Sequence, residues 1–116
     1  MVNLPKPIAD FFRLKNAEDD EGLVQLFAED AIVIDAGERK EMRGRAEITQ
    51  WIEKSISGLH LQTDVRGCTE RDREWLVDTV LTGNFKASPA RFEYCIALSG
   101  DKIAKLRVEF RGSANR

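Results

Sequence analysis

Residues 26–35, which read Leu-Phe-Ala-Glu-Asp-Ala-Ile-Val-Ile-Asp, constrain the fold more than any other segment. They combine the end of an amphipathic helix, an acidic break at Glu29-Asp30, and a short β-branched strand at residues 31–35. A turn containing Gly37 follows. The segment therefore predicts a tight succession of helix and strand that holds one carboxylate, Asp35, at the strand end.

The chain of 116 residues predicts a single domain over residues 1–116. Its net charge of −2 argues against nucleic acid or an anionic membrane as a partner. No apolar run reaches the ~20 residues of a membrane span, and the first residues lack the apolar block of a signal peptide. Cys68 and Cys95 form no C-x-x-C motif, which indicates reduced thiols and a cytoplasmic location.

Three helices are predicted in the N-terminal half. Pro5 and Pro7 favour the start of the first, and an acidic run at residues 18–21 favours the start of the second, with Asp19 or Asp20 as its cap. Gly44 precedes the third. Their inner faces carry apolar side chains at helical spacing: Ile8, Phe11, Phe12 and the stem of Lys15; Leu23, Leu26 and Phe27; and Ile48, Trp51, Ile52 and Ile56.

The C-terminal half changes to a period of two. Four runs alternate apolar and polar residues, at positions 59–66, 75–81, 92–98 and 104–110, with Gly, Pro or Asp at the breaks between them. Such runs predict an antiparallel meander. Three helices packed on one face of this twisted sheet give an α+β domain shaped like a cone, whose mouth is the default ligand site.

The order and spacing of four segments resemble the nuclear transport factor 2-like superfamily, which includes ketosteroid isomerases and SnoaL-like polyketide cyclases. These segments are Asn16-Ala17, residues 26–35, residues 44–51 and Asp101-Lys102-Ile103. The resemblance runs from about residue 8 to residue 111 and implies a cystatin-like fold. In that fold three N-terminal helices pack on a curved, mostly antiparallel sheet in a cone-shaped, barrel-like arrangement. The fold hosts many activities, so it does not define one.

The resemblance to ketosteroid isomerase also implies site residues. That enzyme uses an aspartate base and an oxyanion hole made by a tyrosine and a protonated aspartate. Its base aligns with Asp35, and its helix-one tyrosine aligns with Phe11, which lacks the hydroxyl. Its protonated aspartate falls on Glu93 or, with a shorter turn at residues 99–101, on Tyr94. Apolar alternation places Tyr94 on the inner face and favours it.

Asp35 and Tyr94 are therefore the predicted catalytic residues. Asp35 can act as a general base, and the alternative is a solvated aspartate that bonds its own turn before Gly37. The Tyr94 hydroxyl can polarise a carbonyl, and the alternative is a packed core tyrosine. Cys95 shares the face of Glu93 and has no histidine partner, so it is not expected to be a nucleophile.

The predicted ligand pocket is lined by Phe11, Trp51, Trp75, Phe92, Phe110 and His60. The aromatic residues can equally be ordinary core. His60 alternates with the apolar face of its run, which favours the outer face. A β-bulge in that strand would reverse the alternation and bring His60 towards Asp35.

No metal or other cofactor is expected. One histidine and two distant cysteines cannot form a usual zinc site, and the acidic clusters lack calcium-loop spacing. The predicted partner is a small apolar molecule, and the predicted activity is that of a cofactor-independent isomerase, cyclase or dehydratase acting by proton transfer to Asp35. The alternative is a non-catalytic ligand-binding or homodimerisation module. A homodimer is expected because Leu76 and Val80 make the outer sheet face partly apolar.

Overall fold

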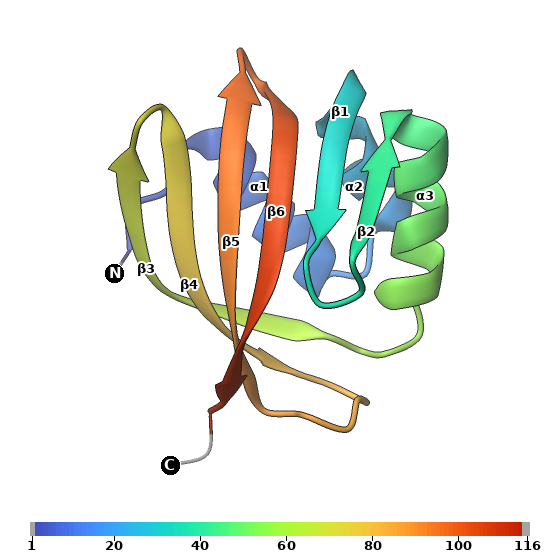
Figure 1. Cartoon of the computed structure of the whole chain (residues 1–116), viewed down its shortest axis with the longest axis vertical. Helices are drawn as coiled ribbons and strands as arrows, with labels where there is room; N and C mark the ends of the chain where they lie inside the picture. Colours follow the sequence, from blue (N-terminus) through green and yellow to red (C-terminus); the bar gives the residue numbers. More distant parts are fainter. Residues whose placement is uncertain (1, 115–116) are drawn as a thin grey trace.

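The computed structural model describes residues 2–114, which form three helices and a six-stranded mixed sheet (Figure 1). In chain order the elements are α1 (Lys6–Asn16), α2 (Asp20–Gln25), β1 (Phe27–Asp35), β2 (Lys40–Arg43), α3 (Gly44–Ser55), β3 (Gln62–Arg71), β4 (Glu74–Thr82), β5 (Ala90–Ser99) and β6 (Lys102–Ser113). This confirms the α+β class. Within residues 2–114, none of the helices has the length and apolar character needed to cross a membrane.

The sheet order is β2-β1-β6-β5-β4-β3, with β1 parallel to β6 and all other neighbours antiparallel. Strands β3 to β6 therefore form the predicted meander. The helices are less strictly N-terminal than expected, because β1 and β2 precede α3. Strand β2 was not predicted, because Met42 is its one buried side chain and its other three residues are exposed.

Strand β1 begins at Phe27, so Glu29 and Asp30 do not form the predicted break. Both side chains are exposed, and the pairing of β1 with β6 shifts register between Phe27 and Ile32. The two acidic residues thus occupy an irregular stretch inside the strand, where their charges stay in water while the strand continues. Asp35 is the last residue of β1, as predicted.

The ends and faces of α1 and α2 agree with the sequence. Pro7 lies in the first turn of α1, where a missing N–H costs nothing, and the buried face is Ile8, Phe11, Phe12 and Lys15. In α2 the predicted cap forms at Asp19, whose carboxylate accepts a hydrogen bond from the Gly22 N–H at 2.9 Å.

Two irregularities change which side chains face inwards. In β3 a register shift between Val65 and Gly67 places Cys68 opposite the buried Val77. The pairing of β6 with β5 shifts register between Ala97 and Leu98 of β5. As a result Ile103 of β6, rather than Ala104, is fully buried. A bulge adds one residue on one strand, and alternation of residue types cannot locate it.

The core lies between the inner face of the sheet and the helices. Phe11, which is fully buried, is its aromatic centre. The Phe11 ring lies edge-on to Phe12, Phe27 and Tyr94, with centroid distances of 5.0, 6.2 and 5.9 Å. These contacts join α1 to the start of β1 and to Tyr94 in the middle of β5.

Candidate functional site

A small cavity of about 80 Å³ lies between the helices and the inner face of the sheet. Its lining residues are Lys15, Asp35, Trp51, Ile56, Leu61, Leu81, Phe92, Tyr94 and Val108. Most are apolar, and three of them, Lys15, Asp35 and Tyr94, carry groups that can hold or exchange a proton. The cavity thus brings together the two predicted catalytic residues and one residue that was not predicted.

The Asp35 carboxylate is held by two donors. Its Oδ2 accepts a hydrogen bond from Trp51 Nε1 at 3.0 Å, and its Oδ1 accepts one from the Glu38 N–H at 3.3 Å. The bond from Glu38 is the contact expected of an aspartate that stabilises its own turn, which was the alternative to a catalytic role. The Asp35 side chain nevertheless also lines the cavity. Trp51, on the buried face of α3, therefore fixes the carboxylate while closing the cavity beside it.

Tyr94 is 3% exposed, and its ring packs edge-on against Phe11 and Phe12. Its hydroxyl makes no hydrogen bond to any residue in the described range 2–114. Burial, and after it the negative charge of Asp35, raises the pKa of this hydroxyl. The group therefore stays protonated near neutral pH and can donate to a bound molecule.

Lys15 is the polar cavity residue that the sequence did not single out. It is 3% exposed, and its ammonium donates one hydrogen bond, to Thr63 Oγ1 at 2.8 Å. Burial lowers the pKa of Lys15 to about 8. The only signal in the sequence was its place on the apolar face of α1, where a lysine usually buries its stem and keeps its charge in water.

Because the Lys15 ammonium is buried, the free energy of unfolding should change with pH in a defined direction. Between the folded pKa of about 8 and the ordinary lysine pKa of 10.5, the unfolded chain binds more protons than the folded one. The free energy of unfolding should therefore rise with pH in this window, by up to about 3 kcal/mol relative to Lys15→Met. Urea titrations of both proteins between about pH 7.5 and about pH 10 measure this difference. Parallel pH profiles of the two proteins would contradict this prediction. Tyr94 and Cys95 are present in both proteins, so their contributions cancel in the comparison.

The other predicted pocket residues divide into three groups. Trp51 and Phe92 line the cavity. Phe11 lies behind Tyr94 as core. Trp75 and Phe110 do not line the cavity, and Phe110 is 50% exposed next to Phe92, with ring centroids 5.6 Å apart.

His60 does not belong to the pocket, contrary to its place among the predicted residues. Its side chain is 67% exposed, and Nδ1 lies 3.2 Å from Oε1 of Glu18. It precedes β3 and has a positive φ of 52°, so strand alternation does not apply to it. The strand does carry a bulge, between Val65 and Gly67, but this lies beyond His60 and cannot turn it inwards.

Cys95 is placed for packing rather than for attack. Its Sγ donates to Glu74 Oε1 at 3.2 Å. Burial, followed by the Glu74 carboxylate, raises the pKa of the thiol to about 11, which disfavours the nucleophilic thiolate. Within residues 2–114 no three His, Cys, Asp or Glu side chains are grouped to hold a metal ion.

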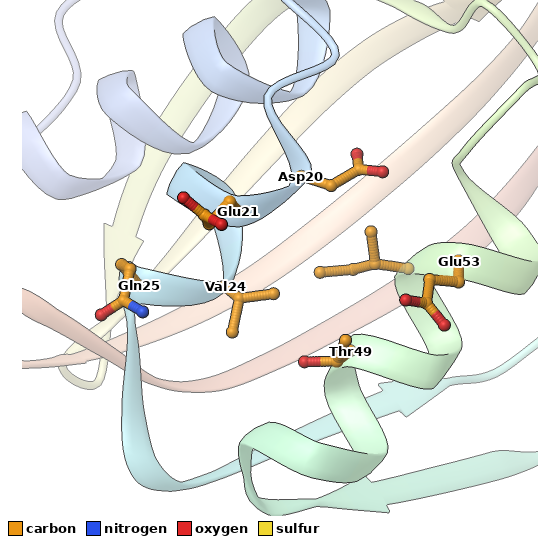
Figure 2. A pocket seen from close by; sticks show the side chains of 7 residues that line it. Asp20, Glu21, Val24, Gln25, Thr49 and Glu53 are labelled. Atoms are coloured by element: carbon orange, nitrogen blue, oxygen red, sulfur yellow. The ribbon is translucent and has the colours of Figure 1, made fainter.

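Two larger hollows lie on the surface. One of about 340 Å³ lies between α2 and α3, bordered by Asp20, Glu21, Val24, Gln25, Thr49, Ile52 and Glu53 (Figure 2). Another of about 270 Å³ lies between β2 and α3. Asp20 already accepts a hydrogen bond from Ser57, and Glu21 and Glu53 are exposed. Neither hollow is lined by a buried hydroxyl or ammonium beside a carboxylate, so the smaller cavity is the better candidate site.

The family model of the SnoaL-like domain matches residues 8–106. The chain belongs to this family. A comparison of this SnoaL-like domain with curated proteins found no match.

Solved structures show the same fold. A candidate polyketide cyclase from Sinorhizobium meliloti has a TM-score of 0.83 and 24% identity, covering 91% of this chain and 95% of that one. A protein with a ketosteroid isomerase-like fold from Catenulispora acidiphila, solved with trimethylamine, has a TM-score of 0.81 and 16% identity. The match covers 97% of this chain and 88% of that one. A cystatin-fold protein from Novosphingobium aromaticivorans has a TM-score of 0.76 and 12% identity, covering 90% of this chain and 95% of that one.

Proposed function

We propose that this SnoaL-like domain is a cofactor-independent enzyme that moves a proton next to a carbonyl group of a small, mainly apolar molecule. One observation carries the proposal: a carboxylate and an unpaired phenol hydroxyl line the same largely apolar cavity. Structural neighbours named for polyketide cyclase and ketosteroid isomerase-like folds are consistent with such chemistry.

The proposed step needs only these two groups. Asp35 removes a proton from the carbon next to the carbonyl, and the electron pair left behind forms the enolate. The Tyr94 hydroxyl donates a hydrogen bond to the enolate oxygen, where negative charge develops. Protonated Asp35 then gives a proton back, which regenerates the carboxylate. Return to the same carbon gives only hydrogen exchange, whereas delivery to a conjugated carbon completes an isomerisation.

The experiment is deuterium incorporation from D₂O into small ketones such as butanone and cyclopentanone, followed by NMR. Catalysed exchange next to the carbonyl, above the buffer rate, is the expected result. Exchange at the buffer rate with every ketone would overturn the proposed catalysis.

A non-catalytic binding module is the second candidate, and the size of the cavity favours it. About 80 Å³ is well below the roughly 300 Å³ at the lower end of usual ligand sites. Phe11 also lacks the hydroxyl that the isomerase resemblance implies at its position. If ketones bind without exchanging, this second function replaces the first.

We also propose that two copies associate through the outer face of the sheet. Leu76, Val80, Ile32 and Ile34 leave partly exposed apolar surface on this face. On the same face Arg111 pairs with Glu93 and Glu109 at 2.6 and 2.9 Å, which satisfies part of the charge beside these side chains. Sedimentation at micromolar concentration should give a dimer, and a monomer there would exclude this interface.

A further inference from the structure

Lys15 carries a buried charge that no direct ion pair compensates, although Asp35 lines the same cavity. No ion pair among residues 2–114 includes it, and its one described hydrogen-bond partner is the neutral hydroxyl of Thr63. An ammonium has three donors, so two remain for other groups. Burying an uncompensated charge is costly, which makes an anionic oxygen the most favourable addition to this place.

The sheet order separates Lys15 from the proposed base. Lys15 is tied to Thr63 on β3, Tyr94 lies on β5, and Asp35 lies on β1. Strands β1 and β3 are four positions apart in the sheet. Along the sheet, the strand of Tyr94 therefore lies between the strand that carries Asp35 and the strand whose Thr63 binds the ammonium.

We propose that Lys15 anchors a carboxylate, and that the substrates of this site are small carbonyl compounds that also carry a carboxylate group. The proposal rests on the proposed function in placing substrate in this cavity. The carboxylate binds the ammonium, the carbonyl oxygen faces Tyr94, and the carbon that loses its proton faces Asp35. A charged oxygen forms the stronger hydrogen bond with the Lys15 ammonium, and a neutral amide oxygen forms a weaker one.

The substrate must be short or must extend out of the cavity. The volume of about 80 Å³ is roughly half that of the ~150 Å³ cavity that holds benzene in another protein. Phe92 lines the cavity and contacts Phe85 and the half-exposed Phe110, with ring centroids 6.5 and 5.6 Å away. An apolar continuation of the substrate can rest on these rings.

The test compares propionate with propionamide, which have the same shape and differ in charge. Binding is followed by NMR at the indole N–H of Trp51, which donates to Asp35 and lines the cavity. The indole of Trp75, the second of two tryptophans, does not line the cavity and serves as the internal reference. Wild-type protein should bind propionate about 10-fold or more tightly than propionamide.

Two variants separate the anchor from general attraction of anions. Lys15→Met keeps an unbranched side chain and should weaken propionate binding about 10-fold or more, and propionamide binding by much less. Lys6→Met removes the same charge from an exposed position on α1, where the side chain is 85% exposed, and should change neither. Equal weakening by both variants, or none by Lys15→Met, would overturn the proposal.

The wild-type comparison does not depend on the folding of any variant. Equal affinity for the two probes, or a Trp51 signal that propionate does not shift, would also overturn the carboxylate site. If propionate is preferred but no ketone exchanges, with or without a carboxylate group, the anchor stands and the proposed catalysis fails. If neutral ketones exchange but propionate is not preferred, the catalysis stands and the substrate class is wrong.

Discussion

Replacing Phe11 by alanine should lower the free energy of unfolding by about 3–5 kcal/mol, a large share of the roughly 5–15 kcal/mol typical of a domain. The Phe11 ring is fully buried and has edge-on contacts with Phe12, Phe27 and Tyr94. Its loss removes apolar burial and leaves a void where α1 meets β1 and β5. Urea unfolding followed by circular dichroism measures the change.

Phe110→Ala is the matched control for this prediction. It removes the same atoms from a side chain that is 50% exposed, so the loss should stay below about 1 kcal/mol. If both variants lost the same amount, Phe11 would not be the centre of the core. The void left by Phe11→Ala would also adjoin Tyr94, so this variant, if it stays folded, should admit larger apolar ligands than wild type.

The sequence predicted those features that depend on local periodicity. The buried face of α1 follows from the spacing of Ile8, Phe11 and Phe12, and the Asp19 cap follows from the residue types at a helix start. The position of Asp35 at the end of β1 follows from a short β-branched run before a turn. These signals are contained within one turn of helix or a few residues of strand.

Features that depend on distant partners could not be read in this way. The bulge in β3 is a property of its register with β4, and β2 is a strand because its backbone pairs with β1. The environment of Lys15 includes Thr63, which is 48 positions away in the chain. The Trp51–Asp35 hydrogen bond likewise joins α3 to the end of β1. Each needs the folded arrangement of two elements that the sequence shows only separately.

Asp35→Asn should reduce deuterium exchange into any ketone that wild type turns over by about 10²–10⁴-fold, the usual contribution of a general base. An amide is nearly the same shape as the carboxylate, but it does not accept the proton. Its oxygen can still accept from Trp51 Nε1, the contact that Asp35 makes at 3.0 Å. Only the longer, exposed bond from the Glu38 N–H at 3.3 Å is lost, so the fold and ligand binding should be retained. Ketone binding at the Trp51 indole signal and urea unfolding check this directly.

Asp30→Asn is the control for the loss of a negative charge, because Asp30 lies on the same strand and is exposed. Its exchange rate should equal that of wild type. Comparable rates in Asp35→Asn and Asp30→Asn would remove Asp35 from the mechanism, however well the carboxylate is placed. A large loss confined to Asp35→Asn, with ketone affinity unchanged, would locate the effect in the proton-transfer step, since binding and folding are measured on the same protein.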